Sequence, residues 1–506
     1  MLAPPIEFGA LNYASLGAYL LITLLVGLWF TRRNRNTSDY FRAGRRVPWL
    51  VMGISIANVS SISYMSIPAK AFAEDWKVFW VNLPILLLAP LVIYVLLPVF
   101  NRLGSASAYE YLEIRFGLSA RLYGAAAFVA FQIGRMALVI YLPALALSAV
   151  TDINIILCIL LIGGLSAVYS ALGGIEGVIW TDFAQTVFLL GAAALSFVLI
   201  VFRLDDGMTT LTQVAADADK FHLIDWSGDY TTNVLWVTLL GSMFAQIVPY
   251  ISDQSMIQRY QTTSDLPAAQ RALWVNAGVA MTNTFIFLGV GTAIYVYYRQ
   301  FPQNLEGLPR PDAILPYFIA HELPPGVAGI VVAGIFAAAQ SAISTSLSST
   351  STVIVTDFLQ RLGRPRTDVA WLRLARWITA LMGAVAVSLA CLLATVRVES
   401  AFDMFQRILG LTTSGLAGLF VLGIFTRRAN LRGALVGAVS SALALYWLQG
   451  HTRVHVYLYA MVGIGTCVVV GYLVSLAGGG TARVSPRNEK GDGGSTPARD
   501  DVTPSG

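Results

Sequence analysis

Charged side chains are scarce in this chain. Aspartate, glutamate, lysine and arginine make up 12% of its 506 residues, whereas hydrophobic residues make up 56% and the mean hydropathy is +0.67. Soluble proteins of this size rarely combine these values, so the sequence predicts a membrane protein. The three cysteines fall in separate apolar runs and the four histidines lie in or beside loops, which disfavours a disulfide framework or a metal cluster. No G-x-x-x-x-G-K-[ST] stretch occurs, so neither ATP-driven work nor an enzyme is indicated.

Long apolar runs fill the space between the few charges. A transmembrane helix needs about 20 apolar residues, and by that criterion the chain has about 13 candidate helices. They span residues 10–31, 47–72, 77–101, 120–149, 153–171, 177–202, 234–252, 270–297, 326–355, 370–395, 402–424, 431–449 and 455–477. We therefore predict an all-α polytopic membrane protein that is embedded in a lipid bilayer.

Basic residues occur in every second loop, and this pattern predicts the orientation. Arginines cluster at 32–46, 361–366 and 427–432, whereas the loop at 205–229 is acidic. Because basic loops stay on the cytoplasmic side, we expect the N-terminus outside and the C-terminus inside. The same pattern explains the net charge of +5 without a nucleic-acid partner. Residues 478–506, which are rich in glycine, serine, proline and charge, are predicted to form a disordered cytoplasmic tail.

One cation stands alone in the fourth predicted span. Arg135 lies within FQIGRMALVIYLPALAL, far from any other charge. A cation at bilayer depth costs roughly 2.5 to 3.5 kcal/mol on insertion scales, so it needs a counter-charge, a wet cavity or an anionic ligand. Arg135 is therefore predicted to bind an anionic substrate. A structural ion pair is the alternative, although no acid on a neighbouring span lies at an obviously matching depth.

Polar residues gather at the centre of the second predicted span. They are Ser55, Asn58, Ser60, Ser61 and Ser63, with Pro68 just beyond them. Because proline removes a backbone donor, we expect a broken helix whose carbonyls and helix ends line a site for substrate and cations. Close packing of small residues is the alternative.

The ninth predicted span is rich in serine and threonine. Ser341, Ser344, Thr345 and Ser348 recur every three or four residues and share one helix face. Hydroxyl and carbonyl oxygens suit a small hard cation, and sodium fits this set better than a transition metal. Helix packing is again the alternative. Asp182, inside the sixth span, either lies near the headgroups or helps to hold a cation.

Five stretches, in order and at the right spacing, resemble the sodium/solute symporter family. They are SASAYEYLEIRFG (105–117), YSALGGIEGVIWTDFAQ (169–185), SDQSMIQRYQTT (252–263), LPPGVAGIVVAGIFAAAQSAIS (323–344) and GIFTRRAN (423–430). The resemblance implies a LeuT-type fold, with one symporter domain over 1–477 and inverted repeats at 47–202 and 234–424. It also implies solute import by alternating access, driven by Na⁺ flowing down its gradient across the cytoplasmic (inner) membrane of a bacterium.

Within this family the chain is most similar to bacterial sodium-coupled sialic acid symporters, which implies two sodium sites. The main site would use the carbonyls of Ile56, Val59 and Ala338 and the hydroxyl of Ser341. A second serine usually follows, but this chain has Ala342, so one ligand of the usual set is missing. The second site would comprise Asp182, Ser341, Ser344 and Thr345. One or two Na⁺ ions would therefore accompany each substrate.

The same resemblance implies how the substrate is held. Its carboxylate would bind Arg135, whose planar guanidinium matches two carboxylate oxygens. Further polar contacts would come from Asn58, Ser60, Ser63 and Asn82. Asn58 and Asn82 stand where threonine and glutamine are typical, and Val78 stands where an aromatic residue is typical. From their depth alone, Gln246 and Gln406 are candidates for binding a hydroxylated solute and Tyr250 for a gate, with structural helix bonding as the alternative.

We therefore expect a Na⁺-coupled symporter for a small carboxylated solute, with sialic acid (N-acetylneuraminic acid) as the first candidate and no obligate protein partner. Another cargo is left open, such as a monocarboxylate, a vitamin, an amino acid or a sugar, and so is proton coupling through Asp182. An ion channel and a membrane sensor are alternatives of a different class. The repeated halves disfavour a channel, and the lack of a signalling domain disfavours a sensor.

Overall fold

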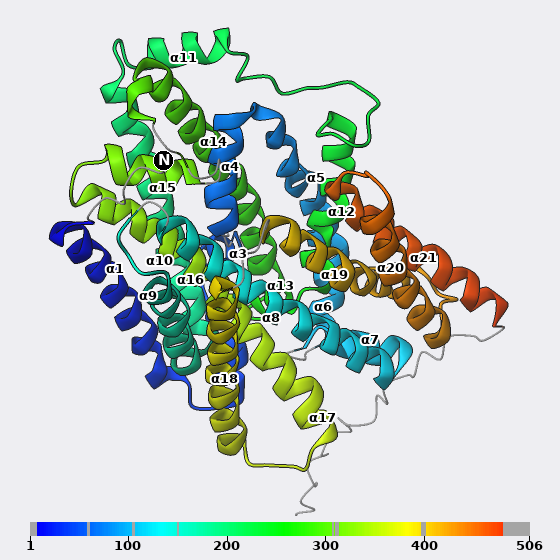
Figure 1. Ribbon diagram of the computed structural model, residues 1–506. Helices are drawn as coiled ribbons and strands as arrows, with labels where there is room; N and C mark the ends of the chain where they lie inside the picture. Colours follow the sequence, from blue (N-terminus) through cyan, green and yellow to red (C-terminus); the bar gives the residue numbers. More distant parts are fainter. Residues whose placement is uncertain are drawn as a thin grey trace, which may run out of the picture.

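The computed structural model describes residues 8–57, 61–103, 107–148, 151–305, 308, 313–395 and 401–478, and for residues 62, 102, 103 and 401–411 the backbone alone. Every regular element in these ranges is a helix (Figure 1). Ten helical stretches among them are long and apolar enough to cross a membrane, which confirms the expected all-α, multi-pass architecture. The total number of spans and the side on which each terminus lies stay predictions. The predicted tail lies outside the described residues, apart from Gly478.

The helices follow the predicted spans. The first part of the chain forms α1 (Ala10–Trp29), α2 (Thr37–Arg42), α3 (Trp49–Ile56), α4 (Ser61–Ala73), α5 (Pro84–Leu91), α6 (Leu97–Leu103), α7 (Glu110–Phe116) and α8 (Leu118–Ser148). The middle part forms α9 (Ile155–Ile159), α10 (Leu165–Arg203), α11 (Met208–Asp217), α12 (Leu235–Ser252), α13 (Gln254–Tyr260), α14 (Leu266–Gln300) and α15 (Ile314–Glu322). The last part forms α16 (Val327–Val353), α17 (Gln360–Leu362), α18 (Asp368–Thr395), α19 (Ala401–Phe425), α20 (Leu431–His451) and α21 (Tyr459–Ala477).

The second predicted span is broken, as expected. Helix α3 ends at Ile56, Ala57 lies in a turn, and the described chain resumes in α4 at Ser61; residues 58–60 lie outside the described residues. Pro68, which was expected to take part in the break, lies inside α4 instead. A proline removes only one backbone hydrogen bond, and membrane helices tolerate this loss where neighbouring groups compensate for it. The first half of the broken helix therefore ends at Ile56, twelve residues before the proline.

The structure contains a second broken helix, which the apolar pattern does not predict. Helix α12 ends at Ser252, Asp253 has an extended backbone (φ −87°, ψ 117°), and α13 starts at Gln254. The Asp253 carboxylate accepts a hydrogen bond from the backbone N–H of Ser255 at 2.8 Å and so caps α13. The predicted span 234–252 ends at the right place. The chain then continues as a buried helix with a charged arginine, which the sequence pattern indicates as a loop.

The fifth and sixth predicted spans meet at a sharp bend. Gly174 lies between them with φ 60° and ψ −164°, a backbone conformation that only glycine adopts readily. A Cβ atom at this position would lie 2.9 Å from the Tyr40 ring and 3.0 Å from the Tyr40 carbonyl oxygen. Beyond the bend, α10 continues to Arg203 and carries Asp182 into the interior of the protein.

Helix α16 forms the centre of the bundle. It packs against α1, α8, α10 and α18, and almost all residues of its apolar stretch are buried inside the protein. Several of its hydroxyls donate to carbonyls on the preceding turn, among them Ser349 to Thr345 (2.9 Å) and Thr352 to Ser348 (2.8 Å). At these positions the hydroxyls are satisfied within their own helix, as expected if the serines and threonines serve helix packing rather than cation binding. Ser344 and Thr345 differ, because their hydroxyls also reach a charged group on α10.

Candidate functional site

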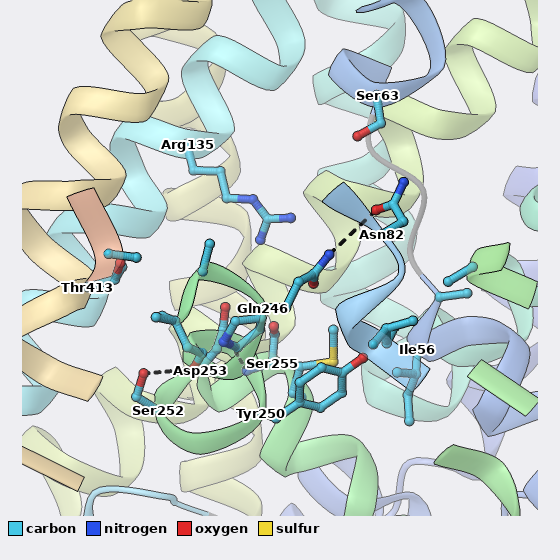
Figure 2. A pocket seen from close by; sticks show the side chains of 18 of the residues that line it. Ile56, Ser63, Asn82, Arg135, Gln246, Tyr250, Ser252, Asp253, Ser255 and Thr413 are labelled. Atoms are coloured by element: carbon cyan, nitrogen blue, oxygen red, sulfur yellow. Dashed lines mark hydrogen bonds between the residues drawn. The ribbon is translucent and has the colours of Figure 1, made fainter. Parts of the chain in front are cut away.

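A cavity of about 360 Å³ lies between the two broken helices. Its walls come from the ends of α3 and α4, from the junction of α12 and α13, and from α5, α8, α14, α19 and α21. Figure 2 shows Arg135, Asn82, Gln246 and Tyr250 around this space. The volume falls within the range of small-molecule binding sites, which is about 300 to 1,000 Å³.

Arg135 extends from α8 toward this cavity and is poorly satisfied by the protein. Its Nη1 atom makes two contacts, each at 3.5 Å, to Gln132 Oε1 and Ser346 Oγ. These distances are at the upper limit for a hydrogen bond. Within the described part of the chain, no carboxylate lies within ion-pair distance of this guanidinium. The predicted cation therefore lies at a cavity wall without the structural ion pair that the sequence left as the alternative.

Polar side chains near Arg135 form one connected wall. Gln246 Nε2 donates to Asn82 Oδ1 at 3.5 Å, and Asn82 Nδ2 donates to Thr284 Oγ1 at 3.0 Å. Ser63, on the first turn of α4, lies at the same cavity. Four of the predicted substrate residues are thus brought together: Ser63, Asn82, Arg135 and Gln246. Asn58, Ser60 and the side chain of Gln406 lie outside the described residues.

Tyr250, the predicted gate, lies at the lower end of the cavity in the view of Figure 2. Its hydroxyl accepts a hydrogen bond from Asn276 Nδ2 at 2.7 Å. Tyr250 also lines a second, much smaller space of about 10 Å³, together with Val92 and Leu273. Tyr250 thus lines both spaces, as do Ile85 and Asn276, and its role as a gate stays a prediction.

Asp182 is the centre of a fully buried polar cluster. Its Oδ1 accepts a hydrogen bond from Ser344 Oγ at 3.0 Å, and its Oδ2 accepts one from Thr345 Oγ1 at 3.0 Å. Ser341, one turn earlier on α16, is also buried, and its carbonyl accepts a hydrogen bond from Ser344 Oγ at 3.0 Å. The four residues predicted for the second sodium site thus lie together, and the Asp182 side chain is fully buried among them.

A fifth member of this cluster, Arg259, was not predicted from the sequence. The Nη2 atom of Arg259, on α13, lies 2.5 Å from Asp182 Oδ2 and 2.6 Å from Thr345 Oγ1. Its Nε donates to Ser55 Oγ at 3.1 Å and its Nη1 donates to the Ser255 carbonyl at 3.2 Å. Both the arginine and the aspartate side chains are 0% exposed. The sequence held one hint of this pair. Arg259 follows the predicted span 234–252 by only seven residues, and an arginine is a suitable partner for a buried acid such as Asp182.

The described residues implied for the main sodium site lie on α3 and α16. Ile56 is the last residue of α3 and lines the cavity, and carbonyls of a last helical turn lack partners from their own helix. Ala338 and Ser341 lie on α16 and are buried. The carbonyl of Ala342, which replaces the usual serine, accepts a hydrogen bond from Ser346 Oγ at 2.9 Å. Val59 lies outside the described residues.

Comparisons with known proteins agree with this geometry. The model of the Sodium:solute symporter family matches residues 40–440. The sodium/sialic acid symporter NanT of Aliivibrio fischeri is 38% identical over 472 residues, which cover 93% of this chain and 94% of the relative. The sodium/sialic acid symporter SiaT of Proteus mirabilis is 37% identical over 473 residues, covering 93% and 95%. These relatives are transporters.

Solved structures show the same similarity. A Na⁺-coupled sialic acid symporter in a substrate-bound, outward-open state superimposes with a TM-score of 0.89 at 36% identity, covering 94% of this chain and 100% of that chain. The expected LeuT-type fold is confirmed by this match. The human sodium/iodide cotransporter is more distant, at 28% identity over 88% of this chain and 70% of its own length.

Proposed function

This chain belongs to the sodium:solute symporter family and is a multi-pass inner-membrane protein, and on that basis we propose that it imports sialic acid together with Na⁺. The observation that carries the proposal is the position of Arg135. A guanidinium at bilayer depth, at the wall of a cavity and without a carboxylate partner among the described residues, is matched by a carboxylated substrate.

The polar wall next to Arg135 supports a hydroxylated cargo. The amide groups of Asn82 and Gln246 both donate and accept hydrogen bonds, so they fit the hydroxyl and amide groups of a sugar acid. Phe128, Phe131 and Phe287 line the same cavity and fit the apolar faces of such a molecule. Sialic acid combines a carboxylate, hydroxyls and an amide, and it therefore matches the whole wall.

Sodium is the second transported species. In the proposed arrangement, the main site joins the end of α3 to α16 through Ile56, Ala338 and Ser341, and it organises the break that lines the substrate cavity. The cluster around Asp182 supplies the oxygens for a second ion. Its Asp182 and Thr345 oxygens are shared with Arg259, so a second Na⁺ has to shift this guanidinium before it gains the carboxylate.

The number of ions determines how steeply the substrate is concentrated. Each Na⁺ moving down a tenfold gradient contributes about 1.4 kcal/mol, and each net charge crossing 100 mV contributes about 2.3 kcal/mol. Two Na⁺ with one monoanion carry one net charge and provide about 5 kcal/mol, which is more than a thousandfold accumulation. One Na⁺ with one monoanion is electroneutral and provides about tenfold.

Alternating access fits the two breaks. In the proposed organisation, residues 1–477 form one symporter domain, the inverted repeats span 47–202 and 234–424, and α3–α4 and α12–α13 are corresponding broken helices. The N-terminus lies outside and the C-terminus inside, as the positive loops indicate. Sodium and substrate enter the cavity from outside, the bundle rocks, and rotation of the Tyr250 ring opens the exit.

The experiment that tests the proposal is uptake of radiolabelled N-acetylneuraminic acid into proteoliposomes with and without an inward Na⁺ gradient. We expect concentrative, Na⁺-dependent uptake by the wild type and its loss in Arg135→Ala. Arg271→Ala is the matched control, because this exposed arginine has a single weak hydrogen bond, at 3.4 Å to the Pro267 carbonyl. Failure of folded wild type to take up the label would exclude sialic acid, and normal uptake by Arg135→Ala would exclude the carboxylate anchor.

A further inference from the structure

The cavity contains two charged side chains among its described lining residues, and only one of them is explained by an anionic cargo. Arg135 is the cation, and Asp253, at the junction of α12 and α13, is the anion (Figure 2). The Asp253 carboxylate accepts one hydrogen bond in the described structure, from the Ser255 backbone N–H to its Oδ1 atom. Its Oδ2 atom therefore has no donor, and no described cation lies within ion-pair distance of it.

The two charges influence each other without forming a pair. Asp253 is close enough to act electrostatically on Arg135, although the two groups remain beyond 4.0 Å. The cationic neighbour on α13, Arg259, is already engaged with Asp182. The Asp253 carboxylate is partly exposed at the cavity wall, so a ligand that brings hydrogen-bond donors to its open oxygen gains charge-assisted bonds there.

A second acceptor on the same cavity is in the same situation. Asn283, on α14, lines the cavity, and its buried Oδ1 atom has no hydrogen-bond partner in the described structure. The cavity thus offers one cation for a carboxylate and, on other walls, two acceptor oxygens without donors. The ligand that complements this arrangement is an acid that also carries several hydroxyl or amide N–H groups.

We infer that Asp253 is a specificity-determining residue, which accepts hydrogen bonds from the hydroxyl or amide N–H groups of a substrate whose carboxylate is bound by Arg135. The inference rests on the proposed function, because it assumes that Arg135 binds the carboxylate. An ionised carboxylate only accepts hydrogen bonds, and such charge-assisted bonds are stronger than neutral ones. Simple monocarboxylates leave Asp253 without a donor, and diacids place a second negative charge near it, so both are rejected.

The substitution Asp253→Asn separates the charge of this residue from its capping role. Asparagine caps helices as well as aspartate does, so α13 keeps its N-cap while the negative charge is removed. Asp265→Asn is the matched control, because Asp265 caps α14 in the same way, with Oδ1 2.8 Å from the Ala268 N–H, and lies outside the cavity. Asp253→Ser, which also provides a capping oxygen, serves as the second variant if Asp253→Asn does not fold.

Calorimetric titration of the full-length protein in saturating Na⁺ tests the inference with N-acetylneuraminic acid, gluconate and hexanoate. Gluconate and hexanoate have equal carbon chains and differ in their hydroxyls. We expect the wild type to prefer the two hydroxylated acids. Asp253→Asn should weaken their binding by about ten- to a hundredfold and leave hexanoate unchanged. Asp265→Asn should match the wild type for all three.

The outcomes separate this inference from the proposed function. A wild type that prefers gluconate over hexanoate, with the preference lost in Asp253→Asn, supports the inference even if N-acetylneuraminic acid is not transported. Wild-type affinities in Asp253→Asn, or no preference for hydroxylated acids in the wild type, overturn it. Loss of all carboxylate binding in Arg135→Ala, with the Asp253 variants unaffected, leaves the proposed function intact and overturns the inference alone.

Discussion

Arg135 and Arg259 are two arginines inside the same membrane protein, and their surroundings are opposite. Arg259 is fully buried and contacts the Asp182 carboxylate, two hydroxyls and a backbone carbonyl. Arg135 lies at the wall of a cavity with two contacts of 3.5 Å and no described carboxylate partner. A cation whose hydrogen bonds and charge are satisfied by the protein stabilises the structure, whereas a cation left unsatisfied at a cavity wall indicates where an anionic ligand binds.

The largest expected effect comes from removing the satisfied cation. Arg259→Ala leaves Asp182 buried and unpaired, and breaking a buried ion pair in this way costs about 3 to 5 kcal/mol. We expect a large fall in melting temperature in detergent, followed by intrinsic fluorescence. Arg135→Ala should leave the melting temperature near that of the wild type, because no ion pair is broken. Equal falls in melting temperature in both variants would show that the two arginines stabilise the protein to the same extent.

A second experiment turns Arg259 into an unsatisfied cation like Arg135. Asp182→Asn keeps the size of the side chain but removes the charge that Arg259 neutralises and that a second Na⁺ would bind. It also leaves Arg259 buried without its counter-charge, so the melting temperature should fall as in Arg259→Ala, and uptake is measured per folded protein. We expect the dependence of uptake on Na⁺ concentration to change from second order to first order, and accumulation to fall from about a thousandfold toward tenfold. Ser349→Ala on α16 is the control, because its hydroxyl bonds only to carbonyls of its own helix. Unchanged Na⁺ order in Asp182→Asn would assign coupling to the main site alone.

The smallest effect tests the geometry of the unsatisfied cation. Arg135→Lys keeps the positive charge but loses the planar pair of donors that matches a carboxylate. We expect substrate affinity to fall about tenfold, which corresponds to the loss of one charge-assisted hydrogen bond. Titration calorimetry in saturating Na⁺ measures it. Affinity equal to that of the wild type would mean that the charge alone attracts the substrate.

The sequence predicts the parts of the site that depend on hydropathy. Arg135 and Asp182 are charges within apolar runs, and the break between α3 and α4 lies in a run of polar residues. Each of these features contrasts with its neighbours, so a single sequence reveals it.

The break between α12 and α13 and the residue Arg259 do not differ in hydropathy from the residues around them in the sequence. The apolar run stops at Asp253, and a polar segment with an arginine resembles an aqueous loop, because hydropathy does not record that α13 packs against α16 and α3 inside the bundle. The partner of Arg259 is 77 residues away along the chain, and only the folded bundle brings the two together. Asn283 and Thr284 were missed for a related reason, since single polar residues on a long helix do not show which side faces a cavity.

Two residues with different roles lie within the eight positions from Asp253 to the end of α13. Asp253 faces the cavity, whereas Arg259 joins α13 to α3, α10 and α16 through Ser55, Asp182 and Thr345. A change in the cavity wall leaves these three contacts in place, but a change at any of the three leaves a buried group without its partner. Over evolutionary time, descendants of this chain are therefore free to acquire new cargoes by single substitutions, while the residues around Arg259 have to change together or stay as they are.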